Sequence, residues 1–231
     1  MKLVLLPGMD GTGILFEAVL PELLKMNTVV LTLPKSGAQD YLTLSKHVVK
    51  HLPDESFILV AESFSGGIAA AMSSQDIPNL KGIIFVASFL SAPKRLLARI
   101  MSWLPVRNIA KLPMASLAHR LFCLGWDADN KELGQFLRAI EAVPSSTLKS
   151  RLKVIASSKF REFKSAIPAV YIGASRDKLV SSGKKKEFKK AYPKIVFTEV
   201  EGPHFVLQTQ PKAGAAAIIE AVQLLTNKGS G

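Results

Sequence analysis

The sequence predicts an α/β fold with a mostly parallel sheet of about six strands, helices on both faces and one helical cap insertion. Short apolar runs without alternation, such as 57–61, are typical of parallel strands that are buried on both faces. These runs alternate with helical patterns, except between residues 93 and 164, where only helical patterns occur. We therefore expect a core made of residues 1–92 and 165–231, and a helical cap insertion at 93–164.

The order of the apolar runs gives the expected elements. Strands are predicted at 2–6, 28–33, 57–61, 81–87, 169–173 and 195–200. Helices are predicted from residue 14, at 42–52, over the small residues that follow 65, over the lysine-rich segment before 195, and at 213–225. Pro34 ends the second strand, and prolines at 105, 113 and 144 interrupt the helical insertion.

The segment 57–67 reads as a strand, an abrupt turn and a helix, with Ser63 at the corner. Such a turn, a nucleophile elbow, needs small residues two positions before and after the serine, and Ala61 and Ser65 meet this requirement. The alternative is that Ser63 only caps the helix. Ser65 fits the same size rule, but the length of the strand favours Ser63 because the elbow serine follows the last strand residue by two.

Composition limits the classes of protein that the chain can belong to. It has 231 residues, 48% hydrophobic and 21% charged, which is enough for one α/β domain with a full core. Cys123 is the single cysteine, so the chain has no intrachain disulfide, and this fits a reducing compartment. No apolar run reaches transmembrane length, and Pro7 ends the apolar start too early for a signal peptide. We expect a cytoplasmic protein.

The net charge of +12 raises nucleic acid or an anionic surface as partners. The basic residues form two sets, at 149–164 and 184–194, without the interleaved aromatic residues of a stacking platform. We read most of them as solvated helix faces and expect no nucleic-acid binding, although weak attraction to an anionic surface is consistent with the charge. His47 and His51 share a helix face at metal-ligand spacing, but no third ligand accompanies them, so we expect a surface pair and no metal.

Three polar residues follow three predicted strands, in the order Ser63, Asp177 and His204. The carboxyl ends of parallel strands form one edge of the sheet, where ligands bind. A serine needs a base to become a nucleophile, and a carboxylate can orient the histidine that acts as this base. Each residue has another reading, such as a turn aspartate or a loop histidine. Their joint occurrence after successive strands favours a catalytic site.

The motifs resemble those of the α/β-hydrolase superfamily over nearly the whole chain. They are Leu6-Pro-Gly-Met-Asp-Gly-Thr-Gly13, Ala61-Glu-Ser-Phe-Ser-Gly66, Gly173-Ala-Ser-Arg-Asp177 and Gly202-Pro-His204. The first motif is similar to that of a subset of small bacterial hydrolases and of the plant phytyl ester synthase acyltransferases. The resemblance implies that Ser63 is the nucleophile, His204 the base and Asp177 the orienting acid. It also implies an oxyanion hole made by the backbone N–H groups of Met9 and Phe64.

The sequence departs from the usual pattern of that superfamily in two places. Ala61 and Ser65 replace the two elbow glycines, and Leu-Pro-Gly stands where many members have His-Gly. Alanine and serine are small enough for the elbow. The proline-containing loop makes Met9 the less secure of the two oxyanion donors.

The expected function is hydrolysis of carboxylic esters with short to medium acyl chains through an acyl-enzyme, without a metal or organic cofactor. We expect an acyl pocket lined by Trp103, Leu104, Leu121, Phe122 and Phe205. An acyltransferase or thioesterase could use the same triad. A protein of another class, a non-catalytic binder of small apolar ligands, could keep the same fold. If Asp177 is not the acid, Asp127 and Asp129 are the next candidates.

Overall fold

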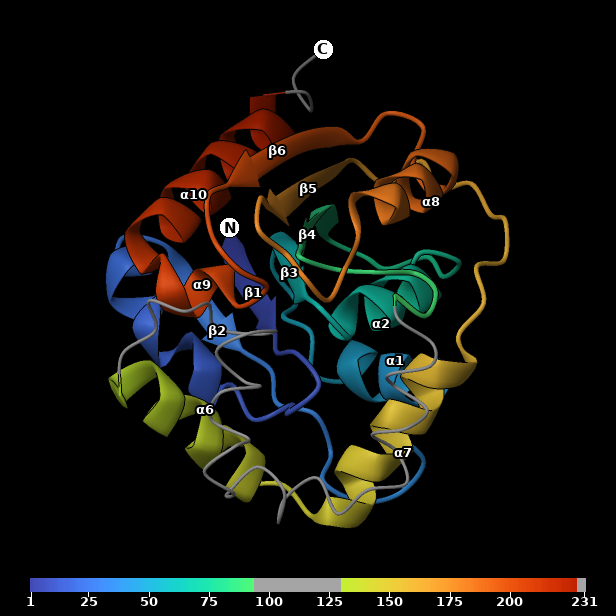
Figure 1. Cartoon of the computed structure of the whole chain (residues 1–231). Helices are drawn as coiled ribbons and strands as arrows, with labels where there is room; N and C mark the ends of the chain where they lie inside the picture. Colours follow the sequence, from blue (N-terminus) through green and yellow to red (C-terminus); the bar gives the residue numbers. More distant parts are fainter. Residues whose placement is uncertain (94–129, 228–231) are drawn as a thin grey trace.

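The computed structural model describes residues 1–93 and 130–227, and these residues form a parallel sheet with helices on both sides (Figure 1). The six strands have the order β2-β1-β3-β4-β5-β6, and every neighbouring pair is parallel. Their bounds are β1 Lys2–Leu6, β2 Asn27–Val30, β3 Phe57–Glu62, β4 Leu80–Val86, β5 Ala169–Ala174 and β6 Val196–Val200. The predicted fold class is therefore confirmed, and the predicted strand positions agree to within a few residues.

The helices of the described residues fall into a core group and an insertion group. Two helices, α6 Asn130–Glu141 and α7 Ser145–Ser157, lie between β4 and β5 in the sequence. The core helices are α1 Tyr41–Val49, α2 Ser65–Met72, α8 Lys185–Ala191, α9 Val206–Thr209 and α10 Pro211–Asn227. In Figure 1, α10 and α9 lie on one side of the sheet, and α1, α2 and α8 lie on the other.

The two faces of the sheet bury alternate residues of each strand, as the period of two requires. In β1, Val4 and Leu6 pack into the core with α1, α2 and α8, while Leu3 and Leu5 pack into the core with α10. Strands β3, β4 and β5 divide in the same way between these two clusters. Both faces are apolar, which explains why these strands appear in the sequence as unbroken apolar runs.

The helix expected from residue 14 is instead a pair of 3₁₀ turns, Ile14–Ala18 and Leu20–Leu23. Pro21 has no N–H group to donate to the carbonyl of Glu17, and its ring would clash with that carbonyl in an α-helix. The tighter 3₁₀ geometry suits two short segments. Leu15, Phe16, Val19 and Leu23 are nevertheless buried, so the segment still covers one face of the sheet.

The strand order reverses direction at β1. From β1 the chain passes to β2 on one side, then crosses back to β3 on the other side and continues outward to β6. Such a reversal leaves a crevice at the carboxyl ends of the two strands that flank it, here β1 and β3. The loop at 7–13 and the turn at Ser63 both start at this point.

Candidate active site

Ser63 stands on a strained turn between β3 and α2. Its φ angle is +48°, in the left-handed region that non-glycine residues rarely adopt. Its backbone N–H donates to the carbonyl of Val86 at 2.9 Å, which holds the turn against the end of β4. A backbone held in this region costs about 1–3 kcal/mol and is typical of functional sites. The elbow predicted from the sequence is thus present.

The residues around the elbow must be small because neighbouring segments of the chain approach them closely. Ala61 and Ser65 are fully buried, and a Cβ on Gly66 would lie 2.7 Å from the Cβ of Ser88. Ser65 has a further role that the size rule did not predict. Its hydroxyl donates to the carbonyl of Pro7 at 2.5 Å, so it joins the elbow to the loop that follows β1.

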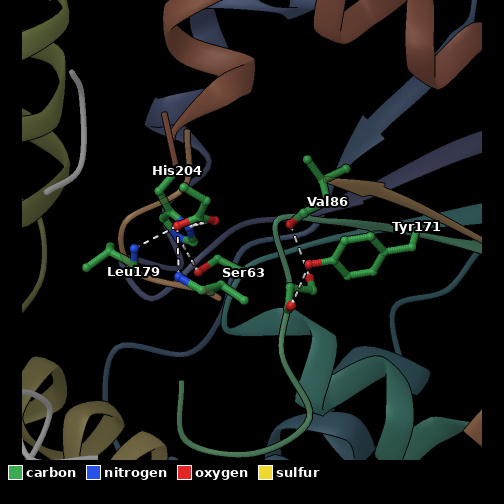
Figure 2. A network of polar contacts seen from close by, with 8 residues as sticks. Ser63, Val86, Tyr171, Leu179 and His204 are labelled. Carbon is green, nitrogen blue, oxygen red and sulfur yellow. Dashed lines mark hydrogen bonds and ion pairs between the residues drawn. The ribbon is translucent and has the colours of Figure 1, made fainter. Parts of the chain in front are cut away.

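His204 lies between Ser63 and Asp177 (Figure 2). Its Nδ1 is 2.8 Å from Asp177 Oδ2, and its Nε2 is 2.9 Å from Ser63 Oγ. An ionised carboxylate can only accept, so Nδ1 carries the proton, and in the neutral imidazole Nε2 then accepts from the serine hydroxyl. The three predicted residues are therefore brought together in one hydrogen-bonded chain.

The loops that carry the acid and the histidine also support each other. The other carboxylate oxygen of Asp177, Oδ1, accepts from the N–H groups of Leu179 and Val180, both at 2.8 Å. The N–H of Arg176 donates to the carbonyl of Gly202 at 2.8 Å, which joins the loop after β5 to the loop after β6. These backbone bonds fix the orientation of the carboxylate toward the imidazole.

The environment of His204 favours its charged form. Burial lowers the pKa of His204, but the charge and hydrogen bond of Asp177, together with the charge of Glu62, outweigh burial and raise the pKa above its ordinary value. An imidazolium that forms during a reaction would be stabilised by the same groups. The site can therefore accept a proton from Ser63 at modest cost.

A second network holds the ends of three strands beside the triad. Tyr171, on β5, donates its hydroxyl to the carbonyl of Ser88 at 3.0 Å (Figure 2). Ser88, just after β4, donates in turn to the carbonyl of Ala61, on β3, at 2.7 Å. Neither residue stood out in the sequence, because a tyrosine in an apolar strand and a serine after a strand are common.

The glycine-rich loop after β1 packs against Ser63. A Cβ on Gly8 would lie 3.8 Å from the Cβ of Ser63. Neither of the backbone N–H groups predicted for the oxyanion hole, those of Met9 and Phe64, donates a hydrogen bond to another described residue. Both amides are thus available to a ligand at the carboxyl edge of the sheet.

A buried polar cluster that includes Glu62 adjoins Ser63. Glu62 is 3% exposed, and its Oε1 accepts from Gln208 Nε2 at 3.0 Å. Burial and the nearby charge of Asp10 raise the pKa of Glu62 to about 7, against the smaller opposing effects of Gln208 and His204. Three oxygen atoms, Asp10 Oδ1, Glu62 Oε2 and Gln208 Oε1, have no hydrogen-bond partner among the described residues.

Arg151 is an exception to the reading of most basic residues as solvated helix faces. It belongs to the set at 149–164, yet its side chain is 0% exposed. Its guanidinium donates hydrogen bonds to the carbonyls of Met9 and Asp10, in the loop after β1. These partners are more than a hundred residues away in the sequence. No local pattern could have separated Arg151 from the neighbouring exposed Lys153.

Four of the five predicted pocket residues, Trp103, Leu104, Leu121 and Phe122, lie outside the described residues, as do Asp127 and Asp129. Phe205 is half-buried and packs edge-on against His204, with ring centroids 5.3 Å apart. It also meets Phe136 of α6, at 5.5 Å. These rings belong to an apolar cluster beside the triad in which Met9, Ile14, Leu133, Leu137 and Phe205 are only partly buried.

The His47 and His51 pair is a surface feature. The two rings are 4.5 Å apart, and His51 Nδ1 bonds to the carbonyl of His47 at 2.8 Å. Within residues 1–93 and 130–227, no group of three or more histidine, cysteine, aspartate or glutamate side chains is arranged to hold a metal. None of the helices in those ranges is long and apolar enough to cross a membrane.

The parallel sheet, the elbow at its carboxyl edge and the three polar residues after β3, β5 and β6 define an α/β-hydrolase. Residues 35–200 match the serine aminopeptidase S33 family, and the chain belongs to this family. A comparison with curated protein sequences gave no match.

Solved structures of similar fold support the assignment of fold class. A hydrolase from Oleispira antarctica superimposes with a TM-score of 0.81 at 16% identity, covering 96% of this chain and 90% of that one. A lipase-esterase related protein from Clostridium acetobutylicum gives 0.74 at 17% identity, with coverages of 95% and 93%. A thermophilic esterase from Thermogutta terrifontis gives 0.77 at 12% identity, with coverages of 97% and 90%. At these identities the likeness establishes the fold.

Proposed function

We propose that this α/β-hydrolase cleaves carboxylic esters with short to medium acyl chains, through an acyl-enzyme formed on Ser63. The observation that carries the proposal is the hydrogen-bonded chain from Ser63 Oγ through His204 to Asp177, at 2.9 and 2.8 Å. A serine hydroxyl that is hydrogen-bonded to a neutral imidazole, at the carboxyl edge of a parallel sheet, can act as the nucleophile in acyl transfer.

The proposed reaction has two halves. Ser63 Oγ attacks the carbonyl carbon while His204 Nε2 takes its proton, and the negative oxygen is held by the N–H groups of Met9 and Phe64. The imidazolium then gives the proton to the leaving alcohol, and the acyl-enzyme remains. In the second half a water molecule loses its proton to His204 and attacks the acyl carbon, which releases the acid and restores Ser63.

The walls beside the triad favour an apolar acyl group. Met9 and Phe205 are both partly buried. Met9 carries one of the proposed oxyanion donors, and Phe205 packs against the proposed base, His204. Phe205 also packs against Phe136 of α6, so the apolar wall extends from the triad to this helix. Each methylene that such a wall buries would contribute about 0.8 kcal/mol to binding.

We favour an ester as the substrate over a peptide whose N-terminal residue is removed. An aminopeptidase needs an anionic group within reach of the substrate's α-ammonium group. Three carboxylates in or beside the site are engaged or covered: Asp177 binds His204, and Glu62 and Asp10 are buried. The partner is then a small ester, and the single cysteine supports a reducing, cytoplasmic setting.

The test combines a covalent probe with substrates of each class. A fluorophosphonate should label the wild-type protein on the peptide that contains Ser63, and Ser63→Ala should not be labelled. Turnover of p-nitrophenyl butyrate, with little turnover of leucine p-nitroanilide, supports the esterase. Labelling with transfer of the acyl group to an added alcohol in preference to water would indicate an acyltransferase. Absence of labelling would leave a non-catalytic binding protein.

A further inference from the structure

Arg151, on α7, is a fully buried side chain that the proposed reaction does not use. Its guanidinium makes four hydrogen bonds. Nη1 donates to the carbonyls of Met9 and Asp10, both at 2.8 Å, and Nη2 donates to the carbonyl of Pro34 at 2.9 Å. Nε donates to Gln39 Oε1 at 2.8 Å. All four acceptors are neutral oxygens.

These bonds fix the peptide groups around the N–H of Met9. The N–H of Met9 belongs to the peptide that carries the Gly8 carbonyl, and this carbonyl accepts from the N–H of Gly11 at 3.0 Å. The next two carbonyls, those of Met9 and Asp10, are the ones that Arg151 binds. Because each peptide is planar, three successive carbonyls held in place also fix the direction of the N–H groups between them.

The loop is fitted closely to the guanidinium. Gly11 has a φ of +68°, and a Cβ at that position would lie 2.4 Å from Arg151 Nη1. The loop also closes on itself, since Asp10 Oδ2 accepts from the N–H of Thr12 at 2.9 Å and from its hydroxyl at 2.5 Å. The arginine therefore completes a loop that is already turned toward Ser63.

Attachment of α7 to the core does not by itself explain a buried cation. Thr147, on the same helix, already joins α7 to the segment after β2 by donating to the carbonyl of Lys35 at 2.5 Å. Burial lowers the pKa of Arg151 to about 10, so it is still charged at neutral pH, and burying a charge is costly. A neutral side chain could anchor the helix at lower cost, whereas a planar fork with several donors is suited to holding two adjacent carbonyls.

We propose that Arg151 is the positioning residue of the oxyanion site, which holds the Met9 N–H in the direction that a developing oxyanion needs. The inference rests on the proposed function, because it assigns Arg151 to one step of that reaction. It predicts that Arg151 acts on the transition state and leaves ground-state binding of the ester nearly unchanged.

The experiment compares Arg151→Met, Arg151→Lys and the matched control Thr147→Val. For each folded variant, kcat and KM are measured with p-nitrophenyl butyrate, together with the Ki of an alkyl trifluoromethyl ketone. This ketone adds to the serine as a hemiketal whose negative oxygen mimics the tetrahedral intermediate. Circular dichroism and Tm report the fold independently.

Loss of one oxyanion donor typically lowers kcat by about 10²- to 10³-fold. We expect Arg151→Met to approach this loss with KM changed by less than about threefold, and Ki to rise in proportion to the fall in kcat/KM. Arg151→Lys should retain more activity, because one ammonium can reach some of the carbonyls. Thr147→Val should lower the Tm and leave kcat and Ki unchanged.

Two results would overturn the positioning role. One is a folded Arg151→Met variant with a kcat within about threefold of wild type. The other is a fall in kcat with no change in the Ki of the ketone. If Arg151→Met does not fold, the same criteria apply to Arg151→Lys. If the wild-type protein neither turns over esters nor binds the ketone, the proposed function itself fails, and this outcome is distinct from a defect confined to the variants.

Discussion

Replacing Glu62 by glutamine should stabilise the protein at neutral and alkaline pH. Glu62 is buried, and the side chain that donates to its carboxylate is that of Gln208, through Nε2. Its other oxygen, Oε2, lies in the same cluster as the unpartnered Asp10 Oδ1. A glutamine keeps the shape, can still accept from Gln208, and removes the charge that burial and Asp10 oppose.

The magnitude follows from the pKa. The pKa of Glu62 rises from 4.5 to about 7, and one pKa unit corresponds to about 1.4 kcal/mol, so ionisation in the folded state costs about 3 kcal/mol. Below pH 4.5 the carboxyl is protonated in both the folded and unfolded chains, and it contributes no pH dependence. Between pH 4.5 and 7 the unfolded chain releases this proton first, so wild-type stability falls, and above pH 7 the loss is complete.

The assay is urea unfolding of wild type and Glu62→Gln at several pH values from 5 to 8, with linear extrapolation of the free energy of unfolding. The advantage of the variant over wild type should grow by about 2.5 kcal/mol across this range, because a part of the total is already present at pH 5. The exposed Glu162, whose pKa its hydrogen bond to Lys190 lowers, is a matched control, and Glu162→Gln should show no such growth. A constant difference between wild type and Glu62→Gln at every pH would refute the reasoning.

Three further predictions concern the proposed reaction. Ser63→Ala should lower p-nitrophenyl butyrate turnover by about 10³-fold or more. Ser65→Ala should keep most of the activity but lose about 1–3 kcal/mol of stability, because the Pro7 carbonyl loses its donor. The reverse pattern would show that the nucleophile is Ser65. Asp177→Asn should keep its far-UV circular dichroism and lose up to about 10⁴-fold in kcat, and near-normal activity would assign the acid to another carboxylate. Across p-nitrophenyl esters, kcat/KM should rise from acetyl to about butyryl or hexanoyl and then level off; a steep preference for acetyl would exclude an acyl pocket.

Local patterns predicted the strands and the residues that follow them. A parallel strand is buried on both faces, so its apolar run is visible in the sequence, and the residue at its carboxyl end falls at a known edge of the sheet. For this reason the sequence alone predicts that Ser63, Asp177 and His204 lie at one edge of the sheet.

The residues that the sequence did not reveal depend on contacts between distant segments. Arg151 is buried because the carbonyls of Met9 and Asp10 meet it, and no spacing within α7 encodes that meeting. The hydroxyl of Ser65 has a partner in the loop after β1, although its local requirement is only small size. In the segment after Gly13 the apolar spacing indicated an α-helix, and Pro21 overrode it.

The pairing of β1 with β3 has a consequence for folding. Leu6 lies beside Ala61 in the register of these strands, so the proposed nucleophile and one proposed oxyanion donor come from segments that are distant in sequence and adjacent in the sheet. Such non-local pairing is slow, because the loop between the strands must close before the contact is gained. Helix content can recover earlier, from local contacts. The proposed esterase activity should therefore return during refolding later than the helix content, because it requires β1 to be paired with β3.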